Sequence, residues 1–208
     1  MTTHTTPLPP GYSPLPPGHL ANIVTFLEMG AKPDPLPAAL FPPEVTLTSF
    51  DPADLAGYRA LFRRVGDPWL WFSQAALPDA ELAALLADPQ IESFALRQDG
   101  EAIGILQLDF REAEACELLF FGLAPGFTAK GLGGALMRAA IARAWAKPIS
   151  RFWLHTCSFD SPAALGFYQR MGFTPYAMQV EVHTDPRLTG DLPEDAAPQI
   201  PLIRPRSP

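Results

Sequence analysis

The chain has 208 residues, of which 48% are hydrophobic, and a formal net charge of -7 at pH 7. This length suits one domain with a real hydrophobic core, and the negative charge argues against a general nucleic-acid binder, which needs a basic surface. No apolar run approaches the roughly 20 residues that span a bilayer, and the N-terminus lacks the basic and apolar regions of a signal peptide. We therefore expect a cytoplasmic protein with no membrane or nucleic-acid partner.

The N-terminal and C-terminal segments are rich in proline. Residues 1–20 repeat a PLPPG unit, which favours an extended polyproline arm, docked or disordered, over an SH3-type ligand motif. Residues 21–29 read as a strand and precede another Pro-rich linker. Residues 184–208 are short of aromatic residues and predict a tail that runs along the surface or frays.

Residues 45–182 show the pattern of one mixed domain core, within a single domain that we expect over 21–183. Strands are predicted at 45–50, 91–97, 102–110, 115–123, 151–157 and 174–182, and helices at 55–66, 79–88, 132–146 and 161–171. Asp51 and Asp54 lie where the cap of the first helix belongs. Short turn segments between the three strands of 91–123 suit hairpins. A strand, helix, strand crossover from 115 to 157 then implies a parallel or splayed pair, so the fold class is α+β or mixed α/β.

Cysteine and histidine usage predicts neither a disulfide nor a metal site. Cys116 and Cys157 each lie in an apolar strand-like run, which favours buried free thiols. The four histidines have no spacing that would bring two of them to one metal ion.

A glycine-rich loop, GLAPGFTAKGLGGAL at 122–136, joins a predicted strand to a predicted helix. The unpaired N–H groups and dipole of a helix N-terminus bind anions, and small residues let a ligand approach the backbone. Such a cradle would comprise Ala129, Lys130, Gly131, Leu132, Gly133 and Gly134. A tight turn or close helix packing would also explain the glycines. The loop fits neither the P-loop nor the Rossmann pattern of glycines.

The glycine-rich loop, followed about 30 residues later by a second motif, resembles the GNAT superfamily of acyl-CoA-dependent N-acyltransferases. The first has Gly131 and Gly133 at the family's glycine positions, with Thr128 where that family has Gln or Arg. The second is SPAALGFYQRMGF, with Ser161 at the family's Asn position, followed by Ala164 and Tyr168. The resemblance covers about two thirds of the chain and leaves out the strand at 21–29.

The resemblance implies a mostly antiparallel central sheet with one splayed parallel strand pair, flanked by helices on both faces. Acetyl-CoA would bind in the splayed gap, its pantetheine arm pairing with backbone groups and its diphosphate resting on the glycine loop. The residues implied are Phe121, Gly122, Leu123, Ala124, Thr128, Ala129, Lys130, Gly131, Leu132, Gly133, Gly134, Ser161, Ala164 and Tyr168. The backbone N–H of Leu123 would stabilise the oxyanion.

Catalytic roles follow from the same resemblance. Tyr168 would protonate the departing thiolate, although its apolar helix face also suits an ordinary core tyrosine. Glu117 would accept the amine proton directly or through water, or else be a bridging surface charge, and Asp109 is a weaker rival. His155 and Cys157 could suggest a base and a nucleophile, but no third group in the sequence orients them.

The acceptor would be a primary amine of a small molecule or peptide. Trp69, Trp71 and Phe72 lie between the first two predicted helices and could line its site, or could simply pack against the sheet. A domain that keeps this fold and binds coenzyme A as a sensor, without turnover, is the alternative. We expect a monomer or homodimer.

Overall fold

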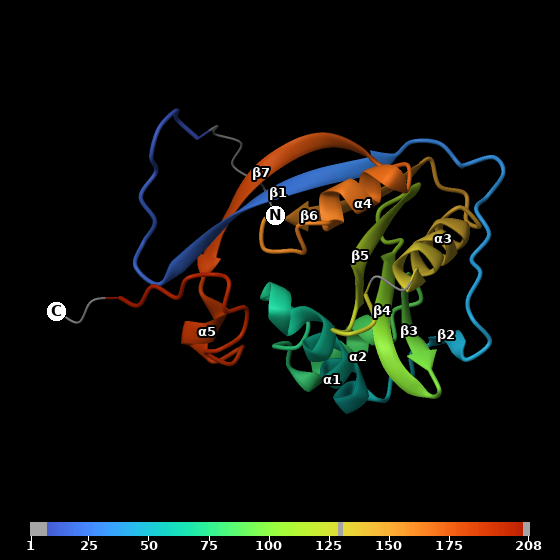
Figure 1. The fold of residues 1–208 in the computed structure, drawn as a ribbon, viewed down its shortest axis with the longest axis horizontal. Coiled ribbons are helices and arrows are strands. Elements are labelled where there is room, and N and C mark those ends of the chain that lie inside the picture. The colour runs from blue at the N-terminus through green and yellow to red at the C-terminus, as the bar shows by residue number, and fades with distance from the viewer. Residues whose placement is uncertain (1–7, 129–130, 206–208) are drawn as a thin grey trace.

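The computed structural model describes residues 8–128 and 131–205, and its centre is a seven-stranded sheet in the order β2-β3-β4-β5-β6-β1-β7 (Figure 1). The strands are β1 His19–Met29, β2 Val45–Ser49, β3 Ile91–Gln98, β4 Glu101–Asp109, β5 Ala115–Leu123, β6 Arg151–Cys157 and β7 Thr174–Thr184. The helices are α1 Leu55–Gly66, the 3-10 turn η1 Asp67–Trp69, α2 Asp79–Leu86, α3 Leu132–Ala144, α4 Ala164–Arg170 and α5 Pro186–Thr189.

The predicted fold class is confirmed. Neighbouring strands are antiparallel except β5 and β6, which are parallel. One face of the sheet packs against α1 and α2 around Tyr58 and Phe62, and the other packs against α3 and α4 around Phe152 and Leu136. Each helix buries one apolar face, so the sheet lies between two helical layers.

Helix α1 begins and ends close to the predicted positions. The Asp54 carboxylate accepts a hydrogen bond of 2.9 Å from the Gly57 N–H, which satisfies one of the unpaired donors of the first turn. Asp51, the other predicted cap, instead accepts from the Ala53 N–H in the preceding turn. Across the described ranges, the helices are too short or too polar to cross a bilayer.

Strand β1 is an internal strand of the sheet, although the family resemblance did not reach it. It lies between β6 and β7 and is antiparallel to both, with Val24 opposite Cys157 on one side and Gln179 on the other. Leu20, Asn22 and Val24 are buried on one face of the strand, and Leu27 and Met29 are buried on the other face farther along it. Leu27 is fully buried in the core. β1 therefore connects β6 to β7, which is the last strand on this side of the sheet.

The C-terminal segment up to residue 205 packs on the domain and does not fray, which leaves the surface-running alternative of the prediction. Its apolar side chains pack around Leu20 and Leu70 to form a third buried cluster, whose other members are Leu192, Ala196, Ala197 and Ile200. The Arg187 guanidinium is buried and lies 2.8 Å from the Asp185 carboxylate, and its other N–H groups donate to backbone carbonyls of the segment. This paired cation organises a segment that contains few large apolar residues.

Candidate active site

The parallel pair β5–β6 opens into a gap after only three residue pairs. Its ladder runs from Ala115, opposite Arg151, to Glu117, opposite Trp153. On its other side, the ladder of β5 with β4 shifts register between Gln107 and Leu108, which marks a bulge at Leu119. Beyond these positions β5 and β6 diverge, and a cavity of about 1100 Å³ lies between them.

The backbone of β5 presents hydrogen-bonding groups to this gap at alternate residues. The Ala124 N–H donates to the Ile103 carbonyl of β4 at 2.8 Å, and the Ala124 carbonyl accepts from Phe127. Because opposite residues in an antiparallel ladder alternate between bonded and non-bonded pairs, the N–H and C=O groups of Leu123 and Phe121 point away from β4.

Two of the four predicted backbone contacts therefore fail. Ala124 has both of its backbone groups engaged, and Gly122 is directed toward β4 by the same alternation. Gly122 instead provides space, because a Cβ on it would lie 2.5 Å from a Val65 methyl group. The backbone groups of Leu123 and Phe121 face the gap, where the resemblance places the pantetheine arm.

The first turn of α3 borders the cavity and has no side-chain cap. Gly131, at the N-cap, adopts a left-handed backbone with φ of 78°, and a Cβ built on it would meet open space. Gly133 and Gly134 line the cavity, as does Thr128 before the turn. Leu132 points its side chain into the core, so only its backbone is available. The predicted Ala129 and Lys130 lie outside the described residues.

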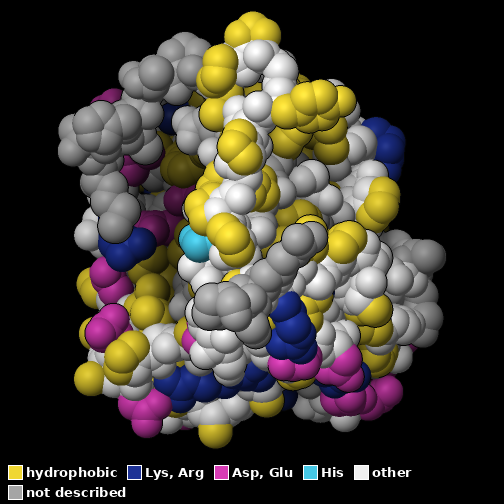
Figure 2. Space-filling view, turned by 90° about the vertical axis from the view of Figure 1, so that its left-hand side faces the viewer, with side chains coloured by type: hydrophobic (Ala, Val, Ile, Leu, Met, Phe, Trp, Pro, Cys, Tyr) yellow, Lys and Arg dark blue, Asp and Glu magenta, His cyan; other side chains and the backbone are white. Residues whose placement is uncertain are grey.

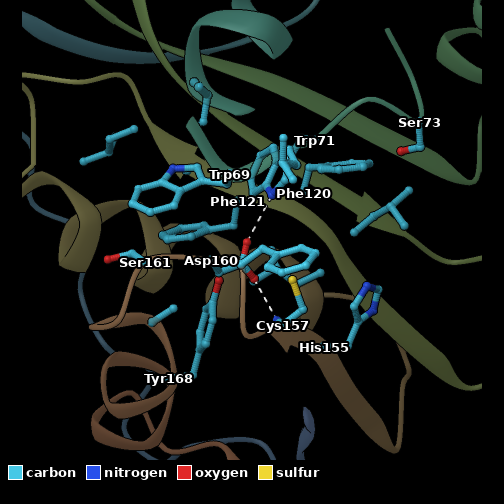
Figure 3. A pocket seen from close by; sticks show the side chains of 18 of the residues that line it. Trp69, Trp71, Ser73, Phe120, Phe121, His155, Cys157, Asp160, Ser161 and Tyr168 are labelled. Carbon is cyan, nitrogen blue, oxygen red and sulfur yellow. Dashed lines mark hydrogen bonds between the residues drawn. The ribbon is translucent and has the colours of Figure 1, made fainter. Parts of the chain in front are cut away.

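The predicted aromatic residues Trp69, Trp71 and Phe72 all line the cavity. Figure 3 shows Trp69 and Trp71 on the side of the cavity opposite Tyr168. Buried polar side chains hold this segment in place. The Tyr58 hydroxyl donates to Gln74, whose amide donates in turn to Gln107 on β4 at 2.7 Å. These bonds fix the segment to the sheet, which makes the aromatic wall rigid.

Asp160 joins the two sides of the cavity and was missed by sequence reasoning. One of its oxygens accepts from the Trp71 indole N–H at 3.1 Å. The other accepts from the Thr156 hydroxyl at 2.7 Å and from the Cys157 N–H at 2.9 Å, as Figure 3 shows in part. A carboxylate in the turn directly after a predicted strand was the available signal, since such residues often bond to local backbone N–H groups.

Tyr168 points from α4 into the cavity with its hydroxyl toward the centre (Figure 3). The residue is 9% exposed and its ring packs edge-to-face against Phe121 and Phe173. Burial, with a smaller contribution from Asp160, raises the pKa of the phenol well above its usual value. The hydroxyl is therefore protonated at neutral pH and can donate a proton.

The Glu117 carboxylate lies beside the His155 ring at the point where β5 and β6 separate, and the two form an ion pair when the ring is protonated. The Glu117 Oε1 lies 3.3 Å from the His155 Nδ1. His155 lines the cavity, whereas Glu117 lies behind it, with its side chain 17% exposed. The hydrogen bond to Glu117 raises the pKa of His155 above its usual value, and the charges of Asp160 and Glu181 add to the effect.

The other chemical candidates from the sequence have different roles. The Asp109 carboxylate holds the Arg111 guanidinium at 3.0 Å, so it is committed to a structural pair. Cys157 is a free thiol in the cavity wall, and burial raises its pKa to about 11. It is therefore protonated at neutral pH and a poor nucleophile.

Among the described residues, no group of three or more side chains suited to binding a metal ion gathers in one place.

The two sequence motifs and the splayed pair β5–β6 are features of a known protein family, and a comparison with protein-family models finds that family. The model of the acetyltransferase (GNAT) family matches residues 58–173, which is more than half of the chain. The chain belongs to the GNAT family. No curated protein sequence matches it.

Solved structures share the GNAT fold at low sequence identity. A GCN5-related N-acetyltransferase from Sphaerobacter thermophilus has a TM-score of 0.63 at 14% identity, over 80% of this chain and 53% of that one. A conserved protein of unknown function from Staphylococcus epidermidis ATCC 12228 has a TM-score of 0.60 at 15% identity, over 81% of this chain and 63% of that one. This chain thus spans less than two thirds of either structure's length.

An aminoglycoside acetyltransferase, meta-AAC0020, from an uncultured soil metagenomic sample aligns with a TM-score of 0.52 at 16% identity. The alignment covers 62% of this chain and 88% of that one. At these identities the three structures establish the shared fold, and the activity has to be argued from the site.

The second GNAT motif supplies the wall of the cavity opposite the aromatic segment. Ser161 and Ala164 both line it, and the Ser161 hydroxyl accepts from the Ala163 N–H at 3.4 Å. Arg170, at the end of α4, also lines the cavity and was not among the predicted residues.

Proposed function

We propose that this chain transfers the acetyl group of acetyl-CoA directly to a primary amine of a small molecule or peptide. The observation that carries the proposal is the gap between β5 and β6, with a proton donor, Tyr168, and an oriented imidazole, His155, both lining it. The GNAT family match supports the same reaction class.

The cavity fits coenzyme A at the glycine turn and along β5. Gly131 and Gly133 leave space at the start of α3, where a Cβ on Gly133 would approach only Leu123, at 3.8 Å. The uncapped N–H groups of this turn would hold the diphosphate, and Arg170 would add a positive charge. When bound, acetyl-CoA supplies the activated acetyl group.

His155, oriented by Glu117, is the group that would accept the proton of the attacking amine. The carboxylate lies 3.3 Å from Nδ1, which favours the tautomer with its proton on Nδ1 and leaves Nε2 as the proton acceptor of the neutral ring. Glu117 therefore acts through His155 instead of touching the acceptor. This refines the predicted role of Glu117 as the base and supplies the third group that the sequence did not reveal.

The remaining steps use β5 and α4. The Leu123 N–H would stabilise the negative charge that develops on the acetyl oxygen, because it points toward the gap. The Tyr168 hydroxyl would then donate its proton to the departing sulfur. Trp69, Trp71 and Phe72 would enclose the acceptor and exclude water.

Incubation of the purified chain with acetyl-CoA and a panel of primary amines tests this function. We expect release of free coenzyme A, measured with a thiol reagent, together with an acetylated amine, measured by mass spectrometry. Tertiary amines of similar shape serve as the control, since they cannot form a stable amide. Tight binding of coenzyme A without turnover of any amine would favour the alternative of a sensor domain.

A further inference from the structure

A buried amide on β1 lacks part of its hydrogen bonding inside the cavity. Asn22 is 3% exposed and lines the cavity, directly opposite Glu181 of β7 in the sheet. Its Nδ2 donates to the Glu181 Oε2 at 2.9 Å. Its Oδ1 is buried and has no hydrogen-bond partner among the described residues. A buried polar atom of this kind costs free energy unless a ligand or water satisfies it.

The Asn22 Oδ1 requires a hydrogen-bond donor as its partner. A carboxylate only accepts, so the Asn22 NH₂ group must face Glu181 and Oδ1 must face away from it. His183, which also lines the cavity, places Nδ1 at 2.9 Å from the Thr184 carbonyl. Because a carbonyl also only accepts, Nδ1 carries the proton, and the neutral ring offers Nε2 as a further acceptor.

The charge of this end of the cavity favours a cation over a neutral donor. Neither β1 nor β7 contains a lysine or arginine. Asp160 lies with Glu181 in the cavity wall. Figure 2 shows acidic side chains, with basic ones among them, around the recess on this side of the molecule. The Phe72 ring lies 5.6 Å from the His183 ring and offers an aromatic face beside them.

This acceptor set is separate from the groups proposed for acyl transfer. His155 lies opposite Phe26 in the sheet, and Asn22 is four residues before Phe26 on the same face of β1. At about 3.3 Å per residue the two positions are roughly 13 Å apart along the strand. A molecule held at Asn22 with its reacting amine at His155 therefore has an extended body with donors at both ends.

We propose that Asn22, Glu181 and His183 form a subsite for a second cationic group of the acceptor, which makes the preferred substrate an extended diamine or polyamine. The inference rests on the proposed acetyl transfer for its kinetic readout. The subsite would bind the protonated distal amine by charge-assisted hydrogen bonds, while the free proximal amine reacts near His155.

Two acceptors of equal length test the subsite, 1,8-diaminooctane and octylamine. We expect kcat/KM to be about 30-fold higher for the diamine, mainly through a lower KM, as one charge-assisted hydrogen bond would give. Glu181→Gln keeps an oxygen for Asn22 and removes the charge, so the ratio of the two kcat/KM values should fall close to one. Glu28→Gln, a matched loss of charge on β1 outside the cavity, should retain the ratio.

Equal kcat/KM for the two amines in the wild type, or an unchanged ratio in Glu181→Gln, would overturn the subsite while leaving acetyl transfer intact. If neither amine is acetylated, titration calorimetry decides on the subsite alone. Tighter binding of 1,8-diaminooctane than of octylamine, lost in Glu181→Gln, would support the subsite. Equal binding of the two would overturn it.

Discussion

Replacing Tyr168 with phenylalanine is expected to lower kcat about 100-fold, because general acid catalysis by a positioned side chain contributes at least this factor. The KM for acetyl-CoA should change little, since the ring and its packing against Phe121 and Phe173 remain. Steady-state kinetics with a primary amine acceptor would measure both quantities. The folded structure should be retained, which thermal unfolding would show.

Tyr176→Phe provides the matched control, because Tyr176 lies on β7, is 45% exposed and does not line the cavity. It should retain the wild-type kcat. A kcat for Tyr168→Phe within about twofold of the wild type would mean that water or another group protonates the sulfur, and that Tyr168 is a packing residue.

The Glu117–His155 pair is expected to set the acid limb of the pH profile. His155 must be neutral to accept a proton, so kcat/KM should be low below its pKa and rise as pH passes through it. The hydrogen bond to Glu117 raises that pKa above the usual value near 6.5. Glu117→Gln removes the negative charge, so the limb should move to lower pH.

His155→Gln should remove this limb and lower the plateau of kcat/KM about 100-fold. His19→Gln, outside the cavity, should keep the wild-type profile. A merely structural role for Glu117 would lower activity without moving the limb, so the position of the limb, measured across a full pH series, separates the two roles. An unchanged limb in Glu117→Gln would contradict the positioning role.

The features that sequence predicts best are local ones. The glycine turn before α3 and the motif of α4 depend on residues close together in the chain, and the structure places Gly131, Gly133, Ser161 and Tyr168 around one cavity. The order of strands and helices was also predictable, because periodicity and turn residues report on neighbouring positions.

Contacts between distant segments could not be predicted in the same way. Residues 21–29 were predicted as a strand, but a strand pattern does not specify its partners, and β6 and β7 lie more than 120 residues later. The Glu117–His155 pair depends on the register of β5 with β6, in which Glu117 meets Trp153. Without that register, Glu117 and Asp109 were both reasonable candidates for the base.

The C-terminal segment shows where composition misleads. Its many prolines and few aromatic residues predict a tail that runs along the surface or frays, yet Leu192 and Ile200 are buried there. Asp185 and Arg187 form a buried pair that satisfies several backbone carbonyls at once. Such a pair is visible in the sequence only as two ordinary surface-type residues.

A crystal structure of the chain with acetyl-CoA is the measurement that tests most directly whether the gap between β5 and β6 is an acetyl-transfer site. We expect the diphosphate within hydrogen-bond distance of the N–H groups of Gly133 and Gly134, the pantetheine arm beside Phe121 and Leu123, and the thioester sulfur next to the Tyr168 hydroxyl. A complex formed at saturating acetyl-CoA in which the cavity holds no ligand, or in which the sulfur lies away from Tyr168, would contradict the mechanism.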